Sequence, residues 1–396
     1  MLRATELLAN VGEIARGFAT QRRERQQRRA LDPADIDKLR EIGLHLAAVP
    51  VQYGGLWESG RASNRTLCEA LRLLAQADSS VGLVSTMHPS VLAFWRDPAA
   101  PLTGQDAWEA QRREVFGTVI DGGWWGTMTS EPGSSGDIAK TKTRATKRSG
   151  GDQAYSITGE KHFGSGSGGT THMLTTALRD GADEPDWFFI DVRNAKWDGS
   201  TGMTLKAPWD GHGMAATNSH GFAFTDYPAT RMAWPGGFSG VANSTGGTST
   251  MAITAPFIGL VDVAMGFMRE EFARRGKKLD DFSAFEKIEW IHAHREAWLV
   301  YQAWEGTLAA LERTGNAQQE AGLAKMSISL LTESIMTRLC KITGGSVFGR
   351  HSPLGHWFED ARALAFLRPP PSLAHDTVFA LSEQGEPGAV RLAARG

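Results

Sequence analysis

The chain has 396 residues, of which 41% are hydrophobic, so it is long enough for two or three domains with a substantial core, and a disordered chain is excluded. Its 42 basic and 44 acidic residues are well mixed and give a formal charge of −2, which leaves no basic stripe for nucleic acid. Two cysteines do not make a disulfide framework, and a reducing cytoplasm fits this composition.

The first 118 residues carry apolar side chains at helical spacing. Three such segments are ATELLANVGEIARGF, PADIDKLREIGLHLAAV and ASNRTLCEALRLLAQADSSVGLVSTMHPSVLAFW. The N-terminus lacks the unbroken apolar stretch of a secretory signal, and we find no apolar run of the roughly 18 residues that a membrane span needs. We expect an N-terminal helical domain over residues 1–118 and no membrane span.

Residues 119–235 have a different texture. Short runs rich in β-branched and aromatic residues, such as AYSITG, THMLTTAL, DWFFIDV and GFAFTD, are separated by Gly, Asp and Pro. This pattern predicts a small antiparallel β domain in the middle of the chain.

Helical spacing returns in residues 236–396, after the stretch GGFSGVANSTGGTST. It continues through APFIGLVDVAMGFMREEFARR, AFEKIEWIHAHREAWLVYQAWEGTLAALERT and GLAKMSISLLTESIMTRLCKITGG. We expect a C-terminal helical bundle, and an α+β protein that is mostly α. The long helices carry more apolar surface than one face can bury, which favours a homo-oligomer, either a dimer or a tetramer.

The stretch WWGTMTSEPGSSGD, at residues 124–137, combines closely spaced glycines with several hydroxyl groups. Such a turn exposes several backbone N–H groups at once and can hold an anion or a polar heterocycle. Gly, Pro and Ser also dominate ordinary surface loops for conformational reasons, so the local pattern alone leaves both interpretations open.

The order of segments and several motifs together resemble the acyl-CoA dehydrogenase superfamily of flavoproteins over nearly the whole chain. In chain order the motifs are GLHLAAVPVQYGG at 43–55, ADSSVGLVSTMH ending at His88, TSEPGSSGD at 129–137, ITGEKHFGSGS at 157–167, WDGHGMAATNSHGFAFTD at 209–226 and ITGGSVFGRHSPLGHWFEDAR at 342–362. Each motif is weak by itself, but their common order is specific. The resemblance implies the acyl-CoA dehydrogenase fold, with a four-helix bundle at the C-terminus.

This resemblance implies a flavin site in which backbone N–H groups and hydroxyls contact the pyrimidine edge of the ring. The residues expected to bind the cofactor are Trp125, Thr127, Thr129, Ser130, Ser135, Phe163, Ser165, Arg275, Gly344 and Gly345. For the two neighbouring tryptophans, Trp124 and Trp125, stacking near the flavin and packing in the sheet core both stay open.

A dehydrogenase of this family needs a carboxylate base that removes the α-proton of a thioester. One usual place corresponds to ALAFLRPPPSLAHD, around Arg368, and the other lies near Ser249, and neither carries an acid. Glu359 and Asp360 come nearest in sequence, and we expect them to form ion pairs at a helix end, for example with Arg362.

The binding pattern for the adenine side of FAD is altered as well. The segment REEFARRGKKLDDF lacks the usual Arg-x-x-Phe-Gly, and Lys341 stands where a Gln usually precedes the Gly-Gly pair. Both FAD and FMN, also as reduced flavin, therefore stay open.

These departures make the chain similar to the flavin-dependent monooxygenase branch of the family, which uses reduced flavin and dioxygen. His88, Ser165 and His375 are the expected catalytic residues, because histidine and serine suit an oxygen-activating site. For His88 the competing interpretation is a core histidine, and for His375 a surface one. An FAD-dependent acyl-CoA dehydrogenase and a non-catalytic flavin-binding scaffold remain the alternatives.

The chain carries no P-loop or dinucleotide-binding fingerprint, so we expect a separate flavin reductase or electron-transfer partner. His292 and His294 lie two residues apart and point to different helix faces, and no Cys/His cluster has zinc spacing, so we expect no metal site. A pocket of Trp, Phe and Met side chains would accept many small molecules, and the sequence does not identify the substrate.

Overall fold

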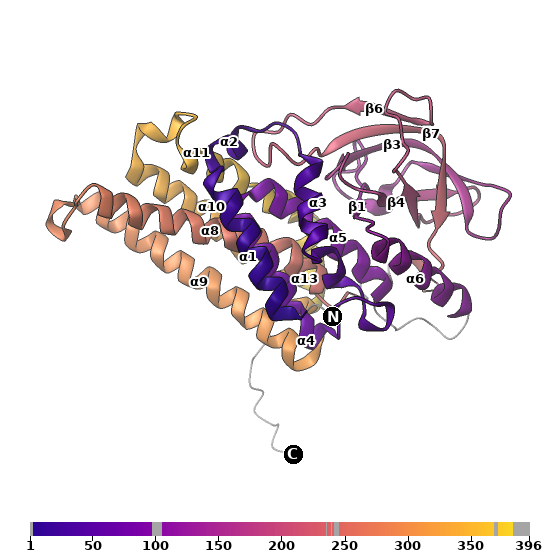
Figure 1. Cartoon of the computed structure of the whole chain (residues 1–396), viewed down its shortest axis with the longest axis horizontal. Helices are drawn as coiled ribbons and strands as arrows, with labels where there is room; N and C mark the ends of the chain where they lie inside the picture. The colour runs from indigo at the N-terminus through magenta and orange to yellow at the C-terminus, as the bar shows by residue number, and fades with distance from the viewer. Residues whose placement is uncertain are drawn as a thin grey trace, which may run out of the picture.

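The computed structural model of the protein describes residues 3–96, 105–234, 236–238, 240, 245–367 and 371–382. Figure 1 shows the N-terminal helices lying across a bundle of long C-terminal helices, with the strands gathered at one side of the molecule. The expected order of helices, sheet and helices is therefore present.

The N-terminal part is helical, as the apolar spacing predicts. Its helices are α1 (Ala4–Thr20), α2 (Arg22–Gln27), α3 (Pro33–Glu41), α4 (Gly60–Ala77), α5 (Ser79–Arg96) and α6 (Gln105–Ile120), with 3-10 turns at Leu44–Ala48 and Val51–Tyr53. Several begin at a side-chain cap: Asp32 accepts from the backbone N–H of Ala34, and Ser59 from that of Ala62. Helix α5 is buried on nearly every face, so it runs through the middle of the molecule.

The middle part is one seven-stranded sheet. Its strands are β1 (Trp125–Thr127), β2 (Arg144–Lys147), β3 (Ala154–Gly164), β4 (His172–Arg179), β5 (Asp186–Asp191), β6 (Met203–Ala207) and β7 (His220–Arg231). Most pairs are antiparallel, as predicted, but β4 also pairs in parallel with β1 and β2. Because β5 bonds to both β4 and β7, the sheet closes on itself around a core of its own.

Among its described residues, the C-terminal part contains three long α-helices and three short ones. They are α8 (Thr248–Arg274), α9 (Ala284–Thr314), α10 (Gln318–Thr343), α11 (Pro353–Ala361), α12 (Ala363–Phe366) and α13 (Pro371–Ser382). Helix α9 begins at a capping box between Ser283 and Glu286 and ends at Gly315, which has the positive φ of 76° that suits glycine. The bundle shares one hydrophobic core with α1, α4 and α5.

Helix α8 corrects one sequence expectation. By length and composition alone it is long and apolar enough to cross a membrane, whereas from the sequence we expected no such segment. In the fold 72% of its most apolar window is buried, against α4, α5, α9 and α10. Its apolar character is therefore accounted for by its place in the core. The exact domain boundaries, after residues 118 and 235, stay a prediction.

Candidate active site

The turn after β1 lies beside the end of β3. The backbone N–H of His162 donates to the carbonyl of Ser130 at 2.8 Å, which joins the two segments by an isolated antiparallel bridge. The chains pack closely here, because a Cβ added to Gly164 would come within 2.8 Å of the Met128 side chain. The structure thus brings together the segments that carry Thr127 to Ser130 and Phe163 to Ser165.

We call these two adjoining segments, residues 127–130 and 163–165, the strand edge. Several side chains on or next to the strand edge present polar or aromatic surface. The hydroxyls of Thr127 and Thr129 make no hydrogen bond with any residue that the structure describes. Phe163 is 55% exposed and has a positive φ of 58°, an uncommon conformation for a residue with a side chain, and such strain often marks a functional position. Ser135 lies in the same turn with a φ of 52° and is exposed.

Ser165 belongs to a chain of hydroxyl groups that the sequence did not reveal. Its Oγ lies 2.7 Å from Oγ of Ser219, which lies 2.7 Å from Oγ1 of Thr217. Thr217 in turn donates to the carbonyl of Met214 at 2.9 Å. The backbone is tied in as well, since the N–H of Gly166 donates to the Thr217 carbonyl at 2.7 Å. A loop of the β domain therefore holds the Ser165 hydroxyl.

His88 lies inside the core, with 1% of its surface exposed. Its Nδ1 accepts from the backbone N–H of Trp125 at 2.8 Å, and its Nε2 lies 2.9 Å from the carbonyl of His45. A carbonyl only accepts, so the neutral imidazole carries its proton on Nε2, and both nitrogens are occupied. Burial lowers the pKa of His88 to about 3. These contacts favour the competing interpretation of His88 as a core histidine.

The two tryptophans of the motif are also buried. The Trp124 ring stacks on His88 with centroids 4.9 Å apart, and the Trp125 ring stacks on His172 at 4.8 Å. Both indoles are at most 1% exposed. Core packing is therefore the structural role of Trp125 and of its neighbour, and within the chain it leaves no free ring face at Trp125 for a cofactor.

The remaining expected residues are not gathered at the strand edge. Arg275 is the C-cap of α8. The α8–α9 hairpin, at whose tip α8 ends, extends to the side of the molecule opposite the sheet (Figure 1). His375 is exposed on α13, which packs on α10 near Gly322. Gly344 and Gly345 follow the other end of α10, about 33 Å from Gly322 at the rise of an α-helix. One chain by itself does not unite these four residues with Ser165.

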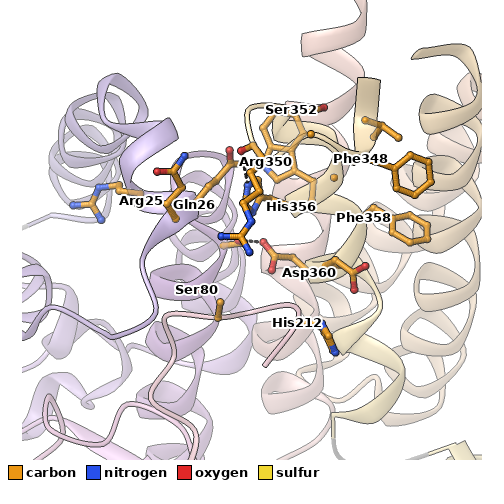
Figure 2. Close-up of a pocket in the computed structure, with 18 of the residues that line it drawn as sticks. Arg25, Gln26, Ser80, His212, Phe348, Arg350, Ser352, His356, Phe358 and Asp360 are labelled. Atoms are coloured by element: carbon orange, nitrogen blue, oxygen red, sulfur yellow. Dashed lines mark hydrogen bonds between the residues drawn. The ribbon is translucent and has the colours of Figure 1, made fainter. Parts of the chain in front are cut away.

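A cavity of about 880 Å³ lies between the N-terminal helices, the β-domain loop around Ala215 and the end of the bundle. In Figure 2, Arg25 and Gln26 come from one wall and Phe348 and Phe358 from the other. This volume is within the range of small-molecule sites. Of the expected cofactor residues, only Gly344 lines it.

The cavity lining carries more basic than acidic side chains among the described residues. The basic ones are Arg25, Arg28, Arg29, Lys341 and Arg350, and the acidic ones are Asp78, Glu359 and Asp360. Three of the basic groups are paired with carboxylates: Arg25 with Asp35 and Asp78, Arg28 with Asp35, and Lys341 with Glu289. The two lining cations that make no ion pair with a described carboxylate, Arg29 and Arg350, favour a ligand with an anionic group.

Asp360 is a cavity residue that sequence reasoning assigned wrongly to a helix-end ion pair. Arg362 pairs with Glu359 instead. The Asp360 carboxylate accepts from the hydroxyl of Ser79 and from the backbone N–H of Met214, so it joins α11 to α5 and to the β domain. Burial raises its pKa to about 6. The FEDAR motif contains Asp360, but Ser79 and Met214, which donate to its carboxylate, lie 281 and 146 residues away in the sequence.

Comparison with known proteins supports the fold and the family. No protein-family model matches the chain. The chain is 26% identical over 359 residues to the amino sugar nitrososynthase DnmZ of Streptomyces peucetius, covering 84% of this chain and 82% of that protein. It is 25% identical over 344 residues to 3-sulfinopropanoyl-CoA desulfinase of Cupriavidus necator, covering 83% and 82%.

Two solved structures have the same fold. FMN-bound TdsC of Paenibacillus sp. A11-2 superposes with a TM-score of 0.77 at 19% identity, over 96% of this chain and 98% of TdsC. Butyryl-CoA dehydrogenase of Megasphaera elsdenii gives a TM-score of 0.76 at 20% identity, over 96% and 97%. The chain is therefore similar in sequence to DnmZ and the desulfinase, and it has the fold of butyryl-CoA dehydrogenase and TdsC.

The likeness to butyryl-CoA dehydrogenase raises the question of the catalytic base. Of the two usual base positions, the one near Ser249 is described, and the Ser249 hydroxyl donates there to the carbonyl of Ser90 at 3.2 Å. The segment around Arg368 to Pro370 lies outside the described residues. At the described position, the structure places no carboxylate.

The strand edge fits the flavin of this acyl-CoA dehydrogenase-like chain. Thr127 and Thr129 offer unpaired hydroxyls, Phe163 offers an exposed ring and Ser165 a hydroxyl held by its neighbours. A flavin presents donors and acceptors along its pyrimidine edge and a flat apolar face, which these groups match.

Proposed function

We propose that the protein is a flavin-dependent monooxygenase that uses reduced FMN or FAD and dioxygen on a small organic substrate. The observation that carries the proposal is the strand edge at Thr129 and Ser165, which offers hydroxyl groups where a flavin would lie, while the described base position at Ser249 has no acid. Such a site suits oxygenation better than proton abstraction from a thioester.

Each residue of the edge has a proposed role. The hydroxyls of Thr127, Thr129 and Ser130 and the turn at Ser135 bind the polar edge of the ring and its side chain, and Phe163 covers its face. Bound reduced flavin supplies the electrons that activate dioxygen. The buried loops around Ser165 limit the access of water to that reaction.

The names of the relatives support this function. TdsC is a dibenzothiophene monooxygenase and its structure contains FMN, and DnmZ is an amino sugar nitrososynthase. The guanidinium groups of Arg29 and Arg350 in the cavity lining suit a phosphate-bearing ligand, and FMN and FAD both carry phosphate. We therefore keep both flavins in the proposal.

Three further properties belong to the proposal. A separate flavin reductase supplies the reduced flavin. The protein forms a dimer or tetramer through α9 and α10, where large apolar side chains are exposed; they include Phe285, Ile288, Ile291, Trp298, Leu299 and Leu330. In such an oligomer, a neighbouring chain's flavin would meet Arg275, Gly344, Gly345 and His375.

The two thiols, Cys68 and Cys340, are unpaired, which suits a cytoplasmic protein.

Asp360 favours a second candidate function, the acyl-CoA dehydrogenase. Its buried carboxyl lines the cavity, and a pKa of about 6 is near that of an effective general base. Both of its oxygens are nevertheless engaged by Ser79 and Met214, which favours a structural role.

The test compares the two reactions in the same preparation. The protein is loaded with reduced FMN or FAD under nitrogen and mixed with ¹⁸O₂ and a panel that includes an aromatic heterocycle and an amino sugar. We expect ¹⁸O in a product that is absent without the protein. Acyl-CoA-dependent reduction of a dye without oxygen incorporation would instead establish the dehydrogenase, and flavin binding with neither reaction would establish a scaffold.

A further inference from the structure

We propose that Thr217 and Ser219 are positioning residues that fix the direction of the Ser165 hydroxyl, so that Ser165 accepts rather than donates a hydrogen bond toward the flavin. This direction makes the site selective for reduced flavin. The inference rests on the proposed flavin site, and it gives a role to two residues of the 209–226 motif to which the sequence assigned none.

The direction starts at the carbonyl of Met214. This oxygen accepts from the Thr217 hydroxyl at 2.9 Å, from the indole N–H of Trp209 at 3.0 Å and from the backbone N–H of Thr217 at 3.2 Å. A carbonyl has no proton to donate, so in its contact with Met214, the shortest of the three, the Thr217 hydroxyl is the donor. The only proton of the Thr217 hydroxyl is therefore committed to Met214.

The same reasoning passes along the chain of hydroxyls. Thr217 has no further proton, so the contact of 2.7 Å with Ser219 requires Ser219 to be the donor. Ser219 has then used its own proton, so its contact of 2.7 Å with Ser165 requires Ser165 to donate. Each oxygen pair at this distance needs one proton between them. Ser165 is left with lone pairs alone on its open side.

Burial keeps this arrangement in place. Thr217 is fully buried, and Ser219 and Ser165 are 8% and 9% exposed, so bulk water does not offer alternative partners to the inner two hydroxyls. A hydrogen bond of 2.7 Å from the backbone N–H of Gly166 to the carbonyl of Thr217 holds the two loops together. The amide of Asn218 adds a bond of 2.9 Å to the carbonyl of Ser167.

The two redox states of a flavin differ at the ring nitrogen N5. In reduced flavin N5 carries a hydrogen and donates, whereas in oxidised flavin it carries a lone pair and accepts. With N5 placed at the open side of the Ser165 hydroxyl, an accepting Ser165 would form a hydrogen bond with the reduced ring and would face the oxidised ring with lone pair against lone pair. A donating serine would have the opposite preference, which would suit an enzyme that begins its cycle with oxidised flavin.

The experiment measures the dissociation constants of oxidised and reduced FMN, the latter under nitrogen, for the full-length protein and three variants. The variants are Ser219→Ala, Thr217→Val and Ser165→Ala, and exposed Ser200→Ala in the same domain is the matched control. Wild type and control should bind reduced FMN more tightly. In Ser219→Ala the Ser165 hydroxyl loses its acceptor and can donate its proton to the ligand. The ratio of the dissociation constants of oxidised and reduced FMN should therefore fall about tenfold, the effect of one hydrogen bond.

Thr217→Val should weaken the preference in the same direction, because the chain of hydroxyls is then free to reverse. Adding Ser219→Ala to Ser165→Ala should change the preference no further than Ser165→Ala alone, since the two act through one bond. Circular dichroism and thermal unfolding identify a variant that fails to fold, and the more conservative Ser219→Thr, which keeps the hydroxyl, should then retain the wild-type preference.

The outcomes separate this inference from the proposed function. Wild type that prefers oxidised FMN, or folded Ser219→Ala and Thr217→Val variants with an unchanged preference, would overturn the inference even if ¹⁸O appears in a product. A normal shift in preference together with acyl-CoA-dependent dye reduction would keep the inference and remove the monooxygenase. Wild type that binds neither form of FMN nor of FAD would overturn both.

Discussion

The ammonium group of Lys161 donates a hydrogen bond of 2.6 Å to the carboxylate of Glu131, and Lys161 is completely buried. Lys161 lies on β3, and Glu131 lies in the turn that follows β1. Glu131 also accepts from the backbone N–H groups of Lys142 and Thr143, at 2.6 and 3.0 Å. This pair therefore joins the motif turn to β3, the strand that ends at Gly164, and so positions the strand edge.

Lys161→Met should destabilise the protein strongly, because it leaves a buried carboxylate without its counter-charge. We expect a loss of about 3–5 kcal/mol in the free energy of unfolding, measured by urea denaturation at neutral pH. Exposed Lys140→Met serves as the control and should change little. The double variant Lys161→Met with Glu131→Gln should recover much of the loss, and no recovery would contradict the assignment.

The Glu131 pair also predicts a pH dependence. Although burial opposes ionisation, Lys161 and the two backbone N–H groups together lower the pKa of Glu131 below its ordinary 4.5. Its stabilising contribution is therefore present above that value and is lost as the pH falls through the folded-state pKa. A Glu131→Gln variant should lack this acid-side loss in urea denaturation between neutral and acidic pH.

His88→Ala should lower the melting temperature, since it removes partners from the Trp125 N–H and the His45 carbonyl and opens a cavity beside Trp124. We expect a loss of roughly 2–5 kcal/mol. His375→Ala, on an exposed helix position, should leave the melting temperature unchanged. A His88→Ala protein that keeps its wild-type melting temperature but fails to bind FMN would restore His88 to the flavin site.

His88 should also make the free energy of unfolding fall in acid. Burial holds its pKa at about 3, below the ordinary 6.5, so the unfolded chain binds the proton more readily. The stability that neutral His88 contributes is present above pH 6.5 and is lost progressively as the pH falls toward about 3. The stability difference between wild type and His88→Ala should shrink over this range.

The buried carboxyl of Asp360 predicts the opposite dependence of the free energy of unfolding on pH. Its pKa in the folded protein is about 6 against an ordinary 3.8, so its contribution is fully present below 3.8 and is lost as the pH rises through about 6. The loss amounts to on the order of 3 kcal/mol. Asp360→Asn should remove this slope when urea unfolding is followed from pH 4 to 7. An unchanged slope in Asp360→Asn would show that another group titrates there.

The exposed apolar side chains of α9 predict a second copy of the chain on this face. Ile288, Ile291 and Trp298 are 57%, 63% and 56% exposed and lie along one side of the helix. Ile291→Asp should shift the mass measured by light scattering toward the monomer. Ile120→Asp, at a 43% exposed position at the end of α6, is the matched control and should leave the mass unchanged. Monomeric wild type would contradict the proposed oligomer.

The sequence by itself determined the architecture, because helices and strands follow from local spacing. The capped starts at Asp32, Ser59 and Ser283 and the stop at Gly315 are local features. The apolar repeat of the long helices and the order of motifs were enough to expect helices, a β domain and a bundle, and to expect a flavin at the TSEPGSSGD turn. The same reasoning missed the membrane-like apolarity of α8, whose partners come from both ends of the chain.

Only the tertiary structure decided which side chains meet. Ser165, Ser219 and Thr217 form their chain across 54 residues of sequence, and nothing in the spacing of hydroxyl residues indicates that contact. Likewise His88 is occupied by two backbone groups that lie 43 and 37 residues away. A hydrogen bond depends on position and direction to within a fraction of an ångström, whereas periodicity determines only which face of an element is buried. The direction of the Ser165 proton is therefore a property of the folded loops.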